Sequence, residues 1–271
     1  AMAQTLHHRG PDDGGVWVDA EAGVALGFRR LSIIDLSPLG HQPMVAAGGR
    51  YVIVFNGEIY NFKDIAASLA QEGVTFRGHS DTEVLLEAIA KWGERAAIAA
   101  CEGMFAIAIW DRRERTLTLA RDRAGIKPLY WGLTHDGVLL FGSELKALRC
   151  HPAWQGEIDR DAVALFMRYG YVPAPYCIYR NTWKLEPGAL LTYRGRAEPT
   201  IVRYWDPRSI AATAQADPAP GTDGERIEML EHLMVRSVKN EMVADVPLGA
   251  FLSGGIDSSL VTALMQANSR R

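Results

Sequence analysis

The strongest restriction on the fold is a change of sequence pattern after residue 205. Up to that point, short apolar runs alternate with turns and a few amphipathic helices. Residues 206–224 (DPRSIAATAQADPAPGTDG) are rich in Ala, Pro, Asp and Gly, show no periodicity and are typical of a linker. At 271 residues, the chain suits two domains, or one large domain and part of another. We therefore expect a domain over residues 1–205, a linker over 206–224 and the beginning of a second domain over 225–271.

The first region combines strand patterns with helix patterns, which predicts an α+β fold. A helix over 80–93 begins with Ser80 and Glu83, which form a predicted capping box, and ends at Gly93. A helix over 62–73 ends at Gly73. Shorter helices are expected at 144–149 and 161–168. Strands are expected at GVWVD (15–19), GVALGFRRLSII (23–34), YVIVF (51–55), GVLLFGS (137–143) and, as two strands around a charged turn, in MFAIAIWDRRERTLTLARD (104–122).

The second region has the order helix, strand, glycine-rich turn, helix. Apolar residues at helical spacing predict a helix over 225–242, and DVPLGAFL (245–252) is typical of a buried strand. SGGIDS follows as a turn, and SLVTALMQA (259–267) as a helix. A strand followed by a glycine-rich turn and a helix is the opening of an α/β nucleotide-binding domain.

The stretch SGGIDSS (253–259) has the composition of a phosphate-binding loop. Consecutive backbone N–H groups, a helix N-terminus and three serine hydroxyls can all donate to phosphate oxygens. It is not the lysine-containing P-loop, because it has no lysine and its spacing differs. The alternative is a glycine-rich connection that binds nothing.

The stretch VFNGEIYN (54–61) allows two interpretations. Asn-Gly after an apolar run predicts a tight hairpin turn. The same two residues also offer two donors, the side-chain amide of Asn56 and the backbone N–H of Gly57. The pair could therefore be a plain turn, or a turn that presents two donors to a reacting group.

Eight motifs occur in one order before SGGIDSS and together with it cover most of the chain: HRGPD (8–12), RRLSIID (29–35), VFNGEIYN (54–61), SDTE (80–83), GMFAIAIWD (103–111), RDRAGIKPLYW (121–131), SELKAL (143–148) and YVPAPYCIY (171–179). In this order they resemble the motifs of glutamine-hydrolysing asparagine synthetases and related carboxylate-amidating enzymes. SGGIDSS resembles the pyrophosphate loop of ATP pyrophosphatases. The resemblance implies an N-terminal-nucleophile hydrolase fold of four layers (αββα), followed by the start of an α/β parallel-sheet synthetase domain.

The resemblance implies a two-site reaction. Glutamine is hydrolysed at one site, and ammonia passes internally to a second site, where ATP and Mg²⁺ activate a carboxylate as an acyl-adenylate. The expected acceptor is aspartate, which would give asparagine. The first alternative is a carboxylate on a sugar or other metabolite, amidated in surface-polysaccharide synthesis. An alternative of another class is a degenerate module that binds glutamine without hydrolysing it.

The resemblance also implies roles for single residues. Asn56 and Gly57 would form the oxyanion hole for the tetrahedral intermediate of glutamine hydrolysis. Arg30 would bind the α-carboxylate of glutamine, because a planar guanidinium suits a bidentate contact. The expected glutamine-binding set is Arg30, Ile33, Ile34, Asn56, Gly57, Glu58 and Asp81, with the two acids holding the α-ammonium group. The expected ATP-binding set is Leu252, Ser253, Gly254, Gly255, Asp257, Ser258 and Ser259.

The nucleophile that the resemblance implies is an N-terminal cysteine whose own α-amino group acts as the base. Only AMAQTLH precedes the first motif. We expect a chain cut at both ends, and the alternative is a glutaminase that has lost its catalysis. Cys101 is expected to be a buried small residue rather than a nucleophile. We expect no metal site at His7 and His8, since adjacent side chains point apart, and we assign no role to Trp183.

Composition restricts which kinds of binding partner and which cellular compartment we expect. A net charge of −3 gives no indication of a nucleic-acid or membrane-surface partner. The longest apolar runs are far shorter than the ~18 residues of a membrane span. Three cysteines without a framework spacing do not indicate a disulfide scaffold, which makes the cytoplasm the expected location. The expected partners are small-molecule substrates, and the family resemblance is compatible with a homodimer.

Overall fold

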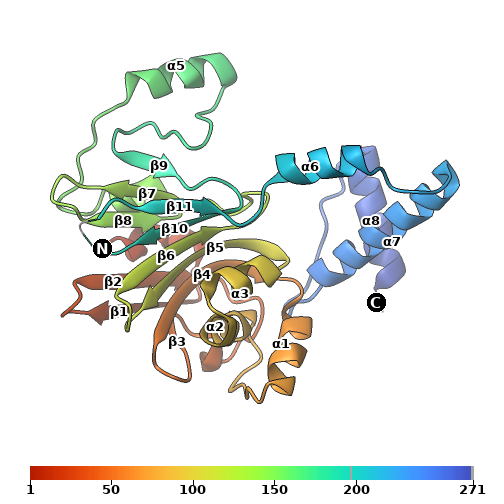
Figure 1. Cartoon of the computed structure of the whole chain (residues 1–271), viewed down its shortest axis with the longest axis horizontal. Helices are drawn as coiled ribbons and strands as arrows, with labels where there is room; N and C mark the ends of the chain where they lie inside the picture. The colour runs from red at the N-terminus through yellow and green to blue at the C-terminus, as the bar shows by residue number, and fades with distance from the viewer. Residues whose placement is uncertain (196, 270–271) are drawn as a thin grey trace. The chain divides into compact units, whose positions relative to one another are not determined.

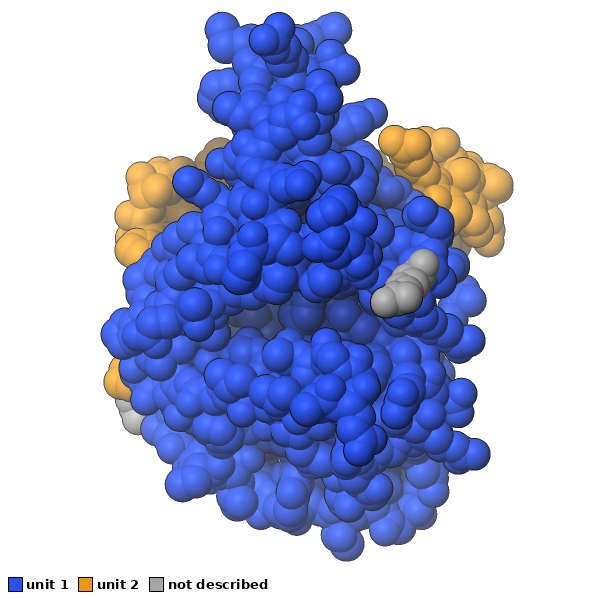
Figure 2. All heavy atoms as spheres, turned by 90° about the vertical axis from the view of Figure 1, so that its left-hand side faces the viewer, with its two compact units in different colours: residues 1–205 blue, residues 206–271 orange. Residues whose placement is uncertain are grey.

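The computed structural model describes residues 1–195 and 197–269. The chain divides into two compact units, unit 1 (Ala1–Trp205) and unit 2 (Asp206–Arg271), which are coloured separately in Figure 2. Within the described part of the chain, no helix is both long enough and apolar enough to cross a membrane.

Unit 1 is built on a six-stranded sheet in which all neighbours are antiparallel (Figure 1). The two nine-residue strands at its centre pair along their whole length, from Tyr51 opposite Asp111 to Ile59 opposite Gly103. Their apolar side chains are buried on both faces, because other layers cover the sheet on each side. In sheet order the strands are β11 (Thr200–Arg203), β10 (Ala189–Tyr193), β6 (Thr116–Arg121), β5 (Gly103–Asp111), β4 (Tyr51–Ile59) and β3 (Met44–Val45).

The prediction that Asn56 and Gly57 form a hairpin turn is wrong. Both residues lie inside β4, where Asn56 pairs with Ala106 and Gly57 with Phe105 of β5. A glycine is needed here because the backbones approach closely. A Cβ atom on Gly57 would lie 2.0 Å from the carbonyl oxygen of Met104. Pairing with a strand nearly 50 residues away therefore overrides the local turn preference of Asn-Gly.

Helices α1 (Phe62–Gln71), α2 (Asp81–Trp92) and α3 (Glu94–Ala100) cover one side of this sheet (Figure 1). Gly73 and Gly93 follow α1 and α2 with φ of +85° and +84°, as helix ends favour. The capping box predicted for α2 is half formed. Ser80 accepts a hydrogen bond from the Glu83 N–H, but the Glu83 carboxylate turns to the backbone N–H groups of Arg77 and Gly78.

A second layer of strands covers the other side of the sheet. It consists of the hairpin β1 (Asp13–Asp19) and β2 (Val24–Arg30) and a three-stranded sheet in the order β8 (Leu139–Gly142), β7 (Tyr130–Leu133) and β9 (Thr182–Lys184). Leu26 and Trp131 of this layer share a buried cluster with Val52 and Val54 of β4. Trp183 stacks on Trp131 with 4.6 Å between ring centroids, so its role is to fill this layer. Helices packed against layers of antiparallel β-sheet make the fold α+β, as predicted.

Among the described residues of unit 1, four further helical segments are present: η1 (Ala3–Arg9), η2 (Pro38–Gly40), α4 (Leu145–Leu148) and α5 (Arg160–Tyr169). The last two lie where the sequence predicted helices. Asp159 caps α5 by accepting from the N–H groups of Asp161 and Ala162, and Gly170 ends it with φ of +75°.

Unit 2 contains three helices within the described residues: α6 (Pro207–Ala216), α7 (Asp223–Glu241) and α8 (Ile256–Asn268). The segment expected to be an irregular linker forms α6, since Asp206 caps it and Pro207 occupies its first position. Thr222 and Glu225 form a full capping box for α7 that we had not predicted. The last two residues of the predicted second domain, 270 and 271, lie outside the described residues.

The buried strand predicted at 245–252 is also wrong. No strand forms over this segment in the described part of unit 2, and Phe251 is fully exposed. An apolar run becomes a strand when a neighbouring strand pairs with its backbone. The described residues of unit 2 form helices and connecting segments but no strand, so this segment has no strand to pair with there.

Candidate active site

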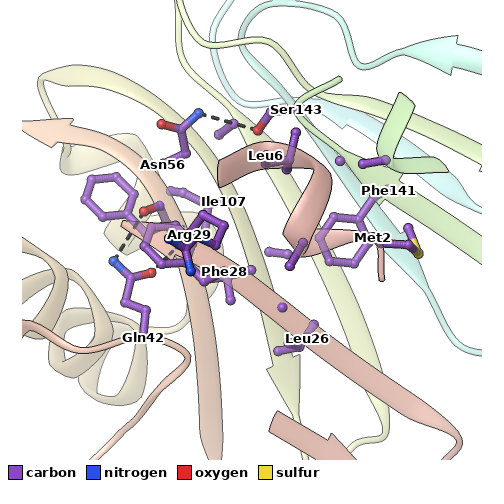
Figure 3. Close-up of a pocket in the computed structure, with 18 of the residues that line it drawn as sticks. Met2, Leu6, Leu26, Phe28, Arg29, Gln42, Asn56, Ile107, Phe141 and Ser143 are labelled. Carbon is purple, nitrogen blue, oxygen red and sulfur yellow. Dashed lines mark hydrogen bonds between the residues drawn. The ribbon is translucent and has the colours of Figure 1, made fainter. Parts of the chain in front are cut away.

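A cavity of about 740 Å³ lies in unit 1 between β2, β4 and β8 (Figure 3). Residues from the loop after β2, from the end of β4 and from the start of α2 meet in it. The volume is within the usual range for small-molecule sites. The cavity is lined by all seven residues of the expected glutamine-binding set: Arg30, Ile33, Ile34, Asn56, Gly57, Glu58 and Asp81.

The side-chain amide of Asn56 is held at the cavity by a residue of the second strand layer. Its Nδ2 donates to the Oγ of Ser143, directly after β8, over 3.5 Å (Figure 3). This bond is long, so a better acceptor would readily replace the hydroxyl. Ser143 begins the motif SELKAL, but we had assigned it no role.

Gln42 fixes the backbone of β4 just before Asn56. Its Oε1 accepts from the N–H of Phe55 at 2.7 Å, and its Nε2 donates to the carbonyl oxygen of Phe55 at 3.3 Å. Strand β3 pairs with β4 at Ile53 and Val52, so beyond that point the amide of Gln42 takes the place of a neighbouring strand. Gln42 is buried and lines the cavity. Nothing in the local sequence pattern singled it out.

Arg30 is 7% exposed, and much of its guanidinium is already hydrogen-bonded. Nη1 donates to the Ser37 carbonyl at 3.3 Å, and Nη2 to the carbonyls of Ile34 and Asp35 at 3.2 and 2.5 Å. Among the described residues, these bonds use three of the five guanidinium N–H groups, which leaves two for a ligand. Gly40 packs against this group, where a Cβ would lie 2.0 Å from Nη2.

Asp81 is 5% exposed and stands at the first position of α2. Its Oδ2 accepts from the N–H of Ile59 at 3.0 Å, which ties α2 to the end of β4. Burial, the largest cause, and the nearby Glu58 carboxylate together raise the pKa of Asp81 to about 6, against the lowering effect of the backbone N–H groups of Ile59 and Thr82. Two carboxylates in one wall of a cavity favour a bound cation, because the cation stabilises the charged form of both.

Lys127 is a cationic residue of the cavity wall that had no predicted role. Asp122, which is fully buried, fixes its backbone by accepting from the N–H groups of Lys127 at 3.0 Å and Ile126 at 2.8 Å. Burial lowers the pKa of Lys127, and the Glu58 carboxylate opposes that shift. The motif RDRAGIKPLYW contains both residues, so the signal was present, but nothing in it pointed to the cavity.

Three free cysteines are present, and none of them lines the cavity in the described part of the chain. Cys101 is buried, as predicted, and burial raises the pKa of its thiol to about 12. Its Sγ faces the carbonyl of Ala97 at 3.2 Å. A thiol with such a pKa carries little thiolate at neutral pH and is a poor nucleophile.

Two strands present an unpaired edge to the same cavity. Within residues 1–195 and 197–269, β2 pairs with β1 alone and β8 with β7 alone. Residues 25–30 of β2 and 139–142 of β8 line the cavity. Met2, Ala3 and Leu6 at the start of the chain also line it, and Figure 3 shows Leu6 and Phe141 within it.

The expected ATP-binding residues gather at one junction of loop and helix in unit 2. The Oγ atoms of Ser253 and Ser258 lie 2.9 Å apart, and Ser258 Oγ donates to the Gly255 carbonyl at 3.1 Å. Gly254 has φ of +82°, a conformation that favours glycine, and Gly255 is the N-cap of α8. The hydroxyls thus lie beside the N-terminus of a 13-residue helix.

Comparison with known families matched both regions of the chain. A family described as "Glutamine amidotransferase domain" matches residues 1–205, and one described as "Asparagine synthase" matches residues 229–271. The first match covers all of unit 1.

Three curated proteins illustrate the similarity. "Asparagine synthetase [glutamine-hydrolyzing] 1" of Bacillus subtilis is 39% identical over 97% of this chain and 40% of its own length. "Asparagine synthetase [glutamine-hydrolyzing] 3" of the same organism is 36% identical over 97% of this chain and 41% of its own length. "Amidase chry2" of Gibberella zeae is 35% identical over 96% of this chain and 37% of its own length. The chain therefore spans about two fifths of these relatives.

Among solved structures, the glutamine phosphoribosylpyrophosphate amidotransferase from B. subtilis, complexed with ADP and GMP, has a TM-score of 0.53. It is 20% identical, and the alignment covers 75% of this chain and 45% of that one. Similarity at this level shows a shared fold.

Proposed function

Since the chain belongs to the glutamine amidotransferase domain family through residues 1–205, we propose that the cavity around Asn56 binds glutamine for hydrolysis. The observation that carries the proposal is the meeting of seven residues in one cavity. They come from three separate motifs between residues 30 and 81, and each has a chemical counterpart on glutamine.

The α-ammonium group of glutamine binds to Glu58 and Asp81. Asp81 is buried, and its raised pKa reflects a carboxylate in need of a counter-charge. An ammonium group placed between the two acids supplies that charge and lowers the pKa of Asp81. The contact of Asp81 with the Ile59 N–H keeps the carboxylate at the end of β4.

The α-carboxylate of glutamine binds to Arg30. Three backbone carbonyls already orient the guanidinium, so little further side-chain entropy is lost on binding. Two remaining N–H groups give a charge-assisted contact to a carboxylate. Ile33 and Ile34 line the same part of the cavity.

Asn56 and Gly57 stabilise the oxyanion that forms on the side-chain carbonyl of glutamine. The Asn56 amide exchanges its long bond to Ser143 for a shorter bond to the developing negative charge. Gln42 holds the preceding peptide, so the donors are fixed before the reaction begins.

The nucleophile comes from a cysteine on a strand that adds between β2 and β8. The two unpaired edges border the cavity, and backbone groups at strand edges are the natural partners of an added strand. An N-terminal cysteine on such a strand attacks the side-chain carbonyl carbon, while its own amino group accepts the thiol proton. A thioester forms, ammonia leaves, and water then releases glutamate.

For unit 2, we propose a part in the ATP-dependent activation of a carboxylate. The serine hydroxyls and the carboxylate of Asp257 are oxygen groups of the kind that accompany Mg²⁺ and phosphates. When bound, Mg²⁺ would neutralise phosphate charge during formation of the acyl-adenylate. Aspartate is the acceptor we propose, because two relatives are named asparagine synthetases.

A second acceptor class stays open for a specific reason. A relative of similar identity is named an amidase, so the same two-domain sequence accompanies more than one name. A sugar or metabolite carboxylate is the alternative acceptor. A non-catalytic glutamine-binding module is the alternative of another class, and it differs from the enzyme by the absence of glutamate release.

Titration of ¹⁵N-labelled protein with glutamine, followed by nuclear magnetic resonance, tests the site. We expect the largest shifts at the Asn56 side-chain amide and the Ile59 N–H, and weaker binding of asparagine, which is one methylene shorter. Asp81→Ala should remove the response, whereas Asp111→Ala, which changes a buried acid outside the cavity, should leave it unchanged. Shifts confined to other residues would contradict the proposal.

A further inference from the structure

Asp35 has an unusual environment for an acidic residue outside the cavity wall. Its side chain is 0% exposed, and its backbone has φ of +57°, a left-handed conformation that non-glycine residues seldom adopt. It follows the stretch RRLSII directly, five residues after Arg30. A buried carboxylate in a disfavoured backbone conformation needs compensating contacts.

The contacts of Asp35 reach two separate segments. Oδ1 accepts from the backbone N–H of Ser37 at 3.1 Å and from its hydroxyl at 2.5 Å. Oδ2 accepts from the backbone N–H of His79 at 3.0 Å and lies 3.5 Å from its Nδ1. Burial raises the pKa of Asp35, but the Ser37 and His79 hydrogen bonds outweigh it, and the net pKa is lowered.

Each segment that Asp35 holds carries one half of the proposed glutamine site. On one side, the carbonyls of Asp35 and Ser37 are acceptors for Arg30. On the other side, His79 is two residues before Asp81, the first residue of α2. The segments also pack closely, because a Cβ on Gly78 would lie 2.6 Å from Asp35 Oδ2.

We propose that Asp35 is a positioning residue that sets the distance between the carboxylate-binding Arg30 and the ammonium-binding Asp81. The inference rests on the proposed glutamine site. A carboxylate can hold both segments because both of its oxygens are acceptors: Oδ1 accepts from Ser37 and Oδ2 from His79. Asparagine has similar size and tolerates positive φ, but it offers one acceptor and places an NH₂ group against an N–H donor.

Asp111 provides a matched control. It is also buried, and it accepts from the side chain of Arg50 and from the backbone N–H groups of Arg113 and Glu114. It does not line the cavity. Asp111→Asn therefore removes a comparable buried acceptor at another place in the same unit.

The experiment compares glutamine binding and thermal unfolding for wild type, Asp35→Asn and Asp111→Asn. At a temperature where all are folded, Asp35→Asn should weaken glutamine binding by about tenfold or more, the size typical when a partner that orients a ligand-binding group is lost. Asp111→Asn should bind like wild type despite a lower unfolding temperature. A folded Asp35→Asn variant that binds like wild type would overturn the inference.

Binding of glutaminamide, in which the α-carboxylate is replaced by an amide, distinguishes a misplaced Arg30 from a general loosening of the site. In wild type and Asp111→Asn, this replacement should weaken binding strongly. In Asp35→Asn the loss of affinity from glutamine to glutaminamide, the glutaminamide penalty, should be smaller, because Arg30 is no longer at the right distance from Asp81 to contact the α-carboxylate. An unchanged penalty would contradict the inference.

If Asp35→Asn does not fold, Ser37→Ala takes its place. It removes the hydroxyl donor to Asp35 and keeps the backbone carbonyl that Arg30 uses, and it should reduce both the affinity and the glutaminamide penalty by a smaller factor. Wild-type affinity with a full penalty would overturn the inference. Failure of the proposed function looks different: wild type would bind no glutamine, or Asp81→Ala would bind it normally.

Discussion

Asn56 on β4 and Ser143 after β8 are 87 residues apart in the sequence, and Asn56 Nδ2 lies 3.5 Å from Ser143 Oγ. The contact joins the two strand layers at the cavity. It orients the amide through a weak bond that a negatively charged oxygen can replace at little cost.

Asn56→Ala should lower glutaminase turnover by about 10²–10³ in a protein that carries the nucleophile, with little change in glutamine binding. The donor acts on the charge that develops in the transition state, so it affects the rate rather than the affinity. Ammonia-dependent synthesis should persist, because the second site is separate. Asn61→Ala, which alters an amide bonded to the Ala100 carbonyl, is the control. Turnover within a few-fold of wild type would remove Asn56 from the oxyanion hole.

Arg30→Ala should weaken glutamine binding by about 1.5–3 kcal/mol, the usual range for hydrogen bonds to charged groups. Arg30→Lys should also lose most of the affinity, since an ammonium group has three N–H donors, as many as the three backbone carbonyls already use, and lacks the two further donors of a guanidinium. Arg50→Lys changes an arginine paired with Asp111 away from the cavity and should leave binding intact. Calorimetric titration with glutamine distinguishes these outcomes, and equal affinities for all variants would exclude Arg30 from the site.

Glutamine binding should depend on the protonation of Asp81, whose pKa burial raises to about 6. The charged carboxylate binds the ammonium group, and the charges of glutamine itself are constant near neutral pH. Affinity should therefore decrease as the pH falls through about 6, and proton release on binding should appear near that pH. Binding that is constant between about pH 5 and 7.5 would contradict the assignment of Asp81.

The same pKa shift predicts the opposite trend for the stability of the free protein. The pKa of Asp81 is higher in the folded state than its ordinary value of 3.8, so the folded state holds this proton more tightly. The contribution of Asp81 to the free energy of unfolding should fall as the pH rises from about 4 to about 6. Denaturant unfolding across this pH range gives the free energy of unfolding of wild type and of Asp81→Asn. Relative to wild type, the variant should become more stable as the pH rises.

Asp257→Ala in a protein that carries a whole synthetase domain and the nucleophile should abolish the exchange between ATP and pyrophosphate and leave glutamine hydrolysis measurable. The proposed function assigns the two activities to separate units, and Asp257 stands in the first turn of α8 beside the serine hydroxyls. Asp223→Ala, at the first turn of α7, is a matched control. Unchanged exchange in Asp257→Ala would mean that SGGIDSS is only a connection.

Much of unit 1 could be predicted from the sequence because its signals are local. The helices α1 and α2 end at glycines that adopt positive φ, and the hairpin of β5 and β6 has a charged turn between two apolar runs. These helix ends and this turn depend on neighbouring residues, so the sequence pattern contains them. The residues that the fold brings into one cavity were identified by the resemblance of the motifs to a known family and not by a local rule.

The errors concern contacts between distant residues. Asn56 and Gly57 lie in a strand because β5 pairs with them, and no local rule contains that pairing. Gln42 reaches the site from another element without a motif of its own, and Ser143 lies in the motif SELKAL, which gave no indication of its contact with Asn56. The segment 245–252 is apolar enough for a strand, but a strand also needs a partner, which the described residues of unit 2 do not provide.

Glutamate release from glutamine tests the central claim most directly. The chain as given should release none above a protein-free control, because none of its cysteines lines the cavity in the part that the structure describes. The same chain joined to an upstream segment that begins with cysteine should release glutamate and free ammonia, and a serine in place of that cysteine should abolish the activity. Glutamate release by the unmodified chain, or none from a folded, glutamine-binding protein with the cysteine segment, would contradict the account.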